Sequence, residues 1–278
     1  MSKDRLARFI AILFLIYILP FSAAQDAPAA KQQPPSPSIQ EQTQQTPGKP
    51  EEANGTGKPA PKGTSNDRLF YALPNFLSLE NTGKLPPLST KEKFKVVARG
   101  AFDYIEYPWY GFLSAINQAN DAEPAYGQGW GAYGKRYATS FADGTIENFI
   151  TSAILPSILH QDPRFFQSEA GGFTHKTGYA VSRIFLTRTD SGGTQFNYSE
   201  VLGSGLSAAI STYSYHPRST VLRSPTGPRY VASDRTLVNT ASVWGSQLGY
   251  DTMTIVIKEF WPDIHRALSH KPKAASTH

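Results

Sequence analysis

Residues 199–217 read SEVLGSGLSAAISTYSYHP, and small side chains recur in this segment at intervals of four residues. Two such rows run along it: Gly203, Ser207 and Ser211, and Gly205 and Ala209. Residues four apart lie on one face of an α-helix, and a row of small residues lets a second helix approach closely. An isolated glycine destabilises a helix by about 1 kcal/mol relative to alanine. We therefore expect tight helix packing to compensate for the glycines.

The same spacing recurs in two further segments. Residues 126–159 contain Gly127 and Gly131, then Gly134, Ala138 and Ala142. Residues 237–262 contain Ala241, Gly245 and Gly249. Three segments with the same pattern predict a mainly α fold, in which a single helical bundle packs through small-xxx-small stripes.

Two shorter helices precede these segments. Ser89 and Glu92 have the spacing of a capping box, and apolar residues follow at helical intervals, which predicts a helix over 90–104. Pro108 begins the next predicted helix, because proline is favoured in a first helical turn, where its missing N–H would be unpaired anyway.

Stripes of this kind are typical of membrane-spanning helices, but charged residues interrupt the first of the three segments. Because a charge at mid-bilayer costs at least about 2.5 kcal/mol, we favour a soluble or peripherally membrane-associated bundle. The alternative is an outer-membrane β-barrel, with a hairpin in 179–199 around residues 191–193. A series of alternating ten-residue segments, which a barrel needs, is not evident.

The N-terminus reads as an export signal. Lys3, Arg5 and Arg8 precede an apolar run from Phe9 to Phe21, and small residues follow, which predicts a signal peptide over 1–24. Retention of this segment as an anchor is the alternative. Residues 25–66 are rich in Pro and Gln and predict a disordered linker; residues 67–270 form the helical domain and 271–278 a flexible tail. The expected location is the bacterial periplasm or outer envelope.

Composition excludes several classes of function. The chain has no cysteine, so disulfides, thiolate metal sites and a lipid-modified cysteine are excluded. From Asp67 onward there are 20 Lys and Arg against 17 Asp and Glu, a balance too even to predict nucleic-acid binding. Nucleophile-elbow, phosphate-loop and dinucleotide motifs are absent, and no cofactor or metal is predicted.

Each of the three striped segments ends at a proline, in Asp162-Pro163-Arg164, His216-Pro217-Arg218 and Trp261-Pro262-Asp263. A residue before proline avoids the helical region, so each proline is expected to stop a helix. Basic side chains near a helix C-terminus also complement its dipole. This gives a structural role to His160, Arg164, His216 and Arg218.

The alternative is chemical: His160, Asp162, Arg164 and His175 are candidates for a hydrolase site. A zinc set of His160, Asp162, His175 and His216 is also conceivable, but no two histidines have the spacing that shares a helix face. Asp143 and Glu147 do share a face, and we interpret them as a solvated or salt-bridged pair with Lys135 and Arg136 nearby.

The strings YGQGWGAYGKRY (126–137), ILPSILHQDPRFF (154–166), FNYSE (196–200) and KEFWPDI (258–264) resemble a family of exported bacterial proteins that are known only as uncharacterised. The resemblance implies no activity. We therefore expect a non-enzymatic cell-envelope protein that associates with a membrane surface, an envelope protein or a second copy of itself through a helix face.

Overall fold

The computed structural model of the chain describes residues 64–65, 68–69, 73–79, 85–168, 171–224 and 227–269. The predicted signal peptide, nearly all of the predicted linker and the predicted tail lie outside these residues. The described part is mainly α-helical, as predicted. Within it, no helix has both the length and the apolar composition needed to cross a membrane.

The first described elements are three very short strands, β1 (Arg68–Leu69), β2 (Leu73–Pro74) and β3 (Ser78–Leu79). β1 pairs with β2, and β3 runs parallel to β5 (Phe165–Phe166). Helix α2 (Thr90–Ala101) follows, three residues shorter than expected. Its predicted capping box is present, because Ser89 Oγ accepts from Glu92 N while the Glu92 carboxylate accepts from Ser89 N.

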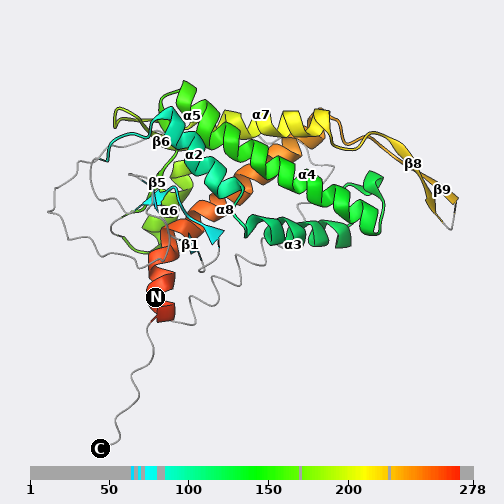
Figure 1. Cartoon of the computed structure of the whole chain (residues 1–278), viewed down its shortest axis with the longest axis horizontal. Helices are drawn as coiled ribbons and strands as arrows, with labels where there is room; N and C mark the ends of the chain where they lie inside the picture. The colour runs from blue at the N-terminus through cyan, green and yellow to red at the C-terminus, as the bar shows by residue number, and fades with distance from the viewer. Residues whose placement is uncertain are drawn as a thin grey trace, which may run out of the picture.

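Helix α3 (Glu106–Ala119) lies against α4 (Trp130–Phe149), and the short helix η1 (Pro124–Tyr126) joins them (Figure 1). α3 begins two residues before Pro108, so the proline occupies its first turn. The helix expected from residue 126 begins only at Trp130, which leaves Gly127 in the connection. α4 continues through a π-helical turn, η2 (Ile150–Ile154), into α5 (Leu155–Ile158).

The next elements are β4 (Gln161–Asp162), β5 and α6 (Phe173–Phe185), followed by a hairpin of β6 (Leu186–Thr189) and β7 (Thr194–Phe196). The turn of this hairpin lies at the predicted 191–193, but a helix occupies the start of the segment that was considered as strand. β4 adds to β6 as a third strand. The polypeptide then enters α7 (Tyr198–Ser214).

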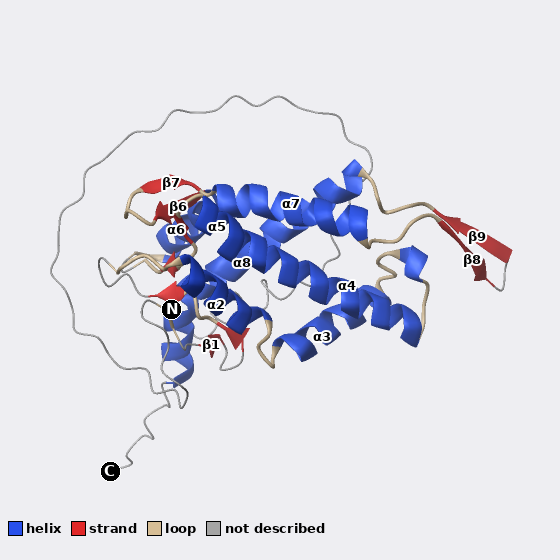
Figure 2. Ribbon diagram, turned by 45° about the horizontal axis from the view of Figure 1, so that its top comes forward, coloured by secondary structure: helices blue, strands red, loops and turns tan. Residues whose placement is uncertain are grey.

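A second hairpin, β8 (Thr220–Ser224) and β9 (Gly227–Val231), projects from the end of α7 away from the helices (Figures 1 and 2). The last helix, α8 (Leu237–Ser269), packs against both α6 and α7. Among the described residues, the apolar core forms two separate clusters. One joins α6 and α8 and includes Phe260 and Ile264; the other joins α2 to η2 and includes Val97 and Ala153.

The prediction that Pro262 stops the last helix is wrong, because α8 runs through it to Ser269. A proline inside a helix leaves the carbonyl four residues earlier without its usual donor. That carbonyl belongs to Lys258, and Gln167 Nε2 donates to it at 2.6 Å. A side chain 91 residues away thus supplies the missing hydrogen bond and lets the helix continue.

The prediction of tight packing at the small-residue stripes holds in α7 and fails elsewhere. A methyl group added at Gly203 would lie 3.0–3.3 Å from atoms of η2 and α5, and one at Gly205 would lie 3.5 Å from the Trp244 ring. A methyl group at Gly131, Gly134, Gly245 or Gly249 would meet nothing within 4 Å. These four glycines do not mediate close helix contact.

Candidate functional site

Helix α7 has its polarity reversed relative to an ordinary surface helix. Its exposed residues are large and apolar over most of its length. We call them the α7 apolar face: Tyr198, Leu202, Leu206, Ile210 and Tyr213. They recur at intervals of three or four residues, so they form one continuous stripe. Leu202, at 59% exposure, is the most exposed of them.

The buried side of α7 is small and mostly polar. Its buried residues are Ser199, Gly203, Ser204, Ser207, Ala208, Ser211 and Thr212. Glu200, the only charged residue of the helix, also faces the protein interior, next to Asp251 of α8. A surface helix of a soluble protein normally buries its apolar stripe and exposes its polar one. α7 does the opposite on both sides.

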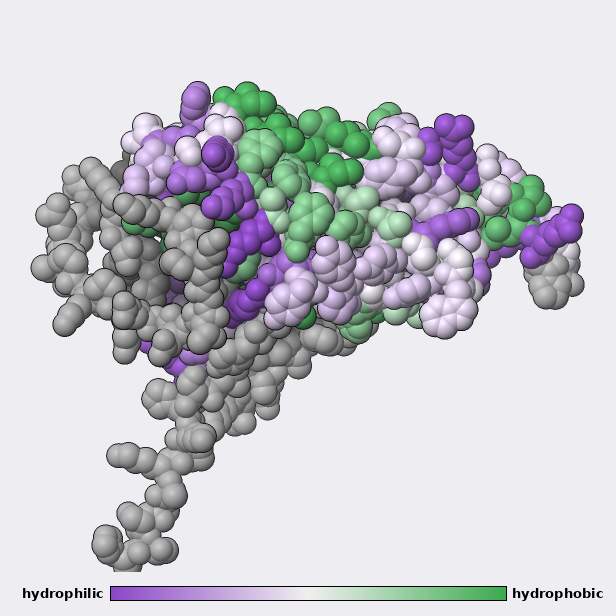
Figure 3. All heavy atoms as spheres, in the orientation of Figure 1, coloured by the Kyte–Doolittle hydropathy of each residue, from purple (hydrophilic) through white to green (hydrophobic). Residues whose placement is uncertain are grey.

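The apolar surface extends beyond α7. Ile154 of η2, Ile158 of α5 and the adjoining Leu159 are also exposed, Ile158 at 65%, and both η2 and α5 contact α7. Figure 3 shows apolar atoms gathered along the edge of the molecule formed by α5 and α7. We call these three residues and the α7 apolar face together the apolar patch. Extended exposed patches of this kind mark protein or membrane interaction sites.

Three carboxyl groups lie in the interior behind α7, contributed by Glu147 of α4, Glu200 of α7 and Asp251 of α8. Burial raises the pKa of all three, and their mutual repulsion raises the pKa of Glu147 and Glu200 further. Glu200 and Asp251 share a hydrogen bond. Burial lowers the pKa of the neighbouring Lys258 despite these carboxyls. These shifts favour the uncharged forms of the four groups.

Asp143 and Glu147 do not form the solvated or salt-bridged pair expected beside Lys135 and Arg136, although Asp143 does lie within ion-pair distance of His216. Glu147 faces the interior carboxyls, and Asp143 accepts hydrogen bonds from Ser211 Oγ and Tyr215 OH, each at 2.5 Å. His216 Nε2 lies 3.6 Å from Asp143. Burial lowers the pKa of His216, but Asp143 and the more distant acids outweigh this effect and hold it above its ordinary value.

Arg136, expected near those acids, instead organises the connection between α3 and α4. Its side chain is fully buried and donates to the carbonyls of Ala122, Glu123 and Gly127. Asp121 and Glu123 in this connection have φ of 50°, a left-handed conformation that is uncommon outside glycine. The buried guanidinium therefore stabilises a strained loop.

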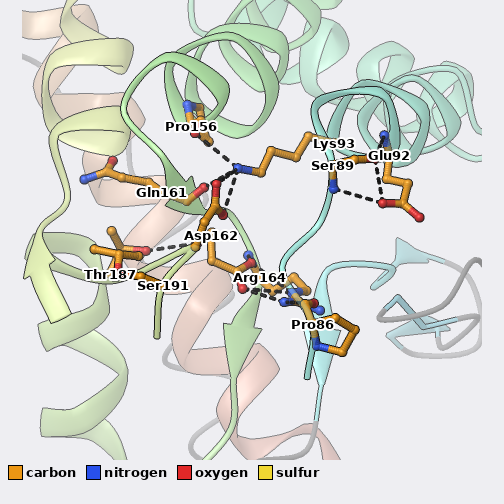
Figure 4. Close-up of polar contacts among 12 residues, drawn as sticks. Pro86, Ser89, Glu92, Lys93, Pro156, Gln161, Asp162, Arg164, Thr187 and Ser191 are labelled. Carbon is orange, nitrogen blue, oxygen red and sulfur yellow. Dashed lines mark hydrogen bonds and ion pairs between the residues drawn. The ribbon is translucent and has the colours of Figure 1, made fainter. Parts of the chain in front are cut away.

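Asp162 and Arg164, two of the predicted site residues, form a buried ion pair (Figure 4). Arg164 Nε lies 2.9 Å from Asp162 Oδ1 and Nη2 lies 2.6 Å from Oδ2, while Nη2 also donates to Pro86 O. Lys93 approaches the same region from α2. Its ammonium donates to the carbonyls of Pro156 and Gln161 and to the Asp190 carboxylate.

The other two predicted site residues lie elsewhere. A pocket of about 80 Å³ is lined by Asp162 and Arg164, but neither His160 nor His175 lines it. Both histidines are exposed, and His160 has φ of 54°. Within the described ranges, no three His, Asp or Glu side chains are placed to hold a metal ion.

The dipole role assigned to Arg164 is wrong, because its guanidinium binds Asp162 and Pro86 O instead of the end of a helix. Arg218 is exposed, and its role stays a prediction. The cation at the C-terminus of α7 is Arg235, which donates to the carbonyls of Tyr213, Ser214 and His216. Sequence spacing gave no signal for Arg235, because it follows the hairpin that separates it from α7.

The α7 apolar face could have been found from the sequence. Leu202, Leu206 and Ile210 recur every four residues, in a row about 100° around the helix from the row of Gly203, Ser207 and Ser211. Comparisons of the chain with family models, with curated proteins and with solved structures find no match.

Proposed function

We propose that this protein is an exported, non-enzymatic protein of the cell envelope, and that its helical domain binds the surface of a lipid membrane through the apolar patch. The observation that carries this proposal is the reversed polarity of α7. Apolar side chains on the outside and polar ones on the inside favour a helix that meets hydrocarbon rather than water.

The chemistry of the patch favours lipid over a protein partner. None of the exposed residues of α7 is charged, and its exposed aliphatic side chains lie between Tyr198 and Tyr213 near the two ends of the helix. Tyrosine is favoured at membrane interfaces because its ring is apolar and its hydroxyl is polar. A helix of 17 residues lying in the plane of the interface can bury such a face to a depth of about 5–10 Å.

The N-terminal sequence supports the same reading. An apolar segment after three basic residues directs the chain to a membrane during export. If that segment is retained, the linker over 25–66 is long enough to let the domain reach the same bilayer.

The hydrolase alternative has weaker support. The Asp162 carboxylate is already bound by Arg164 at short distances, so it is poorly placed to act as an acid or base. His160 and His175 do not line the pocket beside it.

A site-specific probe tests lipid binding without interference from the N-terminal segment. The chain has no cysteine, so Leu206→Cys in the full chain provides a single attachment point for an environment-sensitive fluorophore. Phe112→Cys is the matched control, because Phe112 is 45% exposed against 49% for Leu206 and lies on α3, on the other side of α4 (Figure 2).

We expect zwitterionic phosphatidylcholine vesicles to shift the emission of the Leu206→Cys probe to shorter wavelength. Lipids brominated on their acyl chains should quench it, and the Phe112→Cys probe should not respond. An α7 probe that ignores vesicles but shifts with protein concentration alone would overturn the proposal and assign the patch to a second copy.

A quantitative test removes part of the patch. Leu202→Ser/Leu206→Ser deletes two leucines that are 59% and 49% exposed. Since burying a whole leucine contributes about 1.5–3 kcal/mol, vesicle partitioning should fall by roughly 2 kcal/mol, or about 30-fold. Phe102→Ser/Phe112→Ser, with exposures of 52% and 45%, should change partitioning into zwitterionic vesicles much less. Equal effects of the two double variants would contradict the role of α7.

A further inference from the structure

In the segment that leaves α7, all side chains with a permanent charge are positive. Residues 214–233 contain Arg218, Arg223 and Arg229 and no Asp, Glu or Lys. This segment includes both strands of the β8–β9 hairpin. Its composition differs from that of the domain as a whole, in which acids and bases nearly balance.

The hairpin combines these arginines with exposed apolar side chains. Val221 pairs with Tyr230 across the strands, and Arg223 pairs with Pro228. Residues two apart on a strand share a face, so Val221, Tyr230 and Arg223 point to the same side. Val221 is 59% and Tyr230 is 70% exposed, and Arg223 is also exposed.

The opposite face of the hairpin faces the domain at its base. Leu222 lies near Gly127 in the connection between α3 and α4. Arg229 Nη1 lies 3.7 Å from Asp121 Oδ2, yet the Arg229 side chain remains 61% exposed. An ion pair this long and this exposed contributes little, so its guanidinium is available to another anion.

The hairpin is held in a fixed relation to α7 at its base. Arg235, just after β9, bonds the last carbonyls of α7, and Asp234 N donates to Pro217 O at 3.1 Å. Beyond that base, two strands extend away from the helices (Figures 1 and 2). An isolated two-stranded hairpin is marginally stable in water, and an additional contact would stabilise it.

We propose that the β8–β9 hairpin binds the headgroups of anionic phospholipids, with Val221 and Tyr230 entering the interface. Arg223 meets the phosphates from the same face of the hairpin, and the long, exposed side chain of Arg229 reaches them from the opposite face. This inference rests on the proposed lipid binding by the apolar patch and adds a headgroup preference to it. Arginine forks match phosphate oxygens, and an exposed tyrosine among them suits the headgroup layer. The alternation of apolar and basic side chains fits this layer better than it fits a fully solvated polyanion.

The size of the preference follows from the number of charges. A basic side chain near an anionic leaflet strengthens binding by about fivefold, so two arginines should supply roughly 30-fold tighter binding at low salt. The gain should largely disappear at about 0.5 M salt, where screening reduces the reach of surface charges to a few ångströms.

The test uses the full chain and two kinds of vesicle, one of phosphatidylcholine alone and one containing 30% phosphatidylglycerol (about one anionic lipid in three). Arg223→Gln/Arg229→Gln should lose roughly 30-fold in binding to the anionic vesicles and little in binding to the zwitterionic ones. A fluorophore on Val221→Cys should respond to anionic vesicles and lose the response in high salt. Lys135→Gln/Arg266→Gln removes the same charge from α4 and α8 and is the matched control.

The outcomes separate this inference from the proposed function. If the Leu206→Cys probe enters both kinds of vesicle while Arg223→Gln/Arg229→Gln leaves the anionic preference intact, the hairpin inference fails alone. If the Leu206→Cys probe enters neither, the proposed function fails. A Val221→Cys probe that responds to an oligonucleotide and not to anionic vesicles would overturn the inference and assign the hairpin to nucleic acid.

Discussion

Replacing Arg164 by methionine should destabilise the domain strongly, because it leaves a buried carboxylate without its partner. The Arg164 and Asp162 side chains are 1% and 6% exposed. The guanidinium makes several short contacts to the carboxylate and one to Pro86 O. Breaking a buried pair by removing one partner costs about 3–5 kcal/mol, a large share of the total stability of a typical domain, which is about 5–15 kcal/mol.

The measurement is urea denaturation of the full chain followed by far-UV circular dichroism. Arg164→Met should lower the free energy of unfolding by about 3–5 kcal/mol with an unchanged dependence on urea. The exposed Arg223→Met is the matched control and should change it by no more than about 0.5 kcal/mol.

A double-mutant cycle identifies the cause. Asp162→Leu alone should also be strongly destabilising, because it leaves the buried Arg164 guanidinium without its partner. Asp162→Leu/Arg164→Met removes both charges, so no unpaired charge remains buried. The double variant should therefore be more stable than the sum of the two single changes predicts, by about 2 kcal/mol or more. A cost below about 1 kcal/mol for Arg164→Met, or additive single changes, would refute the reasoning.

Three further changes test other parts of the structure. Burial raises the pKa of Glu106 to about 7, so the folded state holds this proton more tightly than the unfolded state. The free energy of unfolding should therefore fall as pH rises from about 4.5 to 7. Glu106→Gln should stabilise the protein at pH 8, by at most about 3 kcal/mol, and should have no such effect at pH 4. An equal effect at both pH values in thermal denaturation would contradict this. Gln167→Ala leaves the Lys258 carbonyl without its donor and should lower the free energy of unfolding in urea by about 1–3 kcal/mol. Arg235→Gln removes three bonds from the end of α7; hydrogen exchange should rise in that turn, and unchanged exchange would show that the cap is dispensable.

Local features of the fold were predictable from the sequence. The capping box at Ser89 and Glu92 depends on two residues three positions apart, and the structure has it. The small residues of α7 were also assigned correctly to a packed face, because Gly203 and Gly205 do lie against neighbouring side chains. In both cases the deciding atoms are close together along the chain.

Features that depend on distant residues were not predictable. α8 passes through Pro262 because Gln167, 91 residues away, bonds the Lys258 carbonyl. Lys93 is buried because the carbonyls of Pro156 and Gln161 and the carboxylate of Asp190, 97 residues away, surround its ammonium. Spacing along one helix cannot reveal such partners, and the same limit explains why the spacing of Asp143 and Glu147 predicts a solvated or salt-bridged pair.

If the apolar face of α7 binds lipid, vesicles should change the stability of the protein, which a purely structural role of the face would not predict. Burial raises the pKa of Glu147, Glu200 and Asp251 behind α7. Above a pH of about 4.5 the folded state therefore binds more protons than the unfolded state, so the free energy of unfolding in water falls as pH rises. Leu202 and Leu206 are only about half buried, so they contribute less to the fold than core leucines do. Leu202→Ser/Leu206→Ser should therefore lower the stability in water by about 2 kcal/mol, less than the same two changes would cost in a core. The α7 apolar face exists only in the folded form, so vesicles that bind it should raise the stability of the natural chain by linkage. The double variant should lose that increment in addition to its cost in water, and an equal gain from vesicles in both proteins would contradict the role of the face.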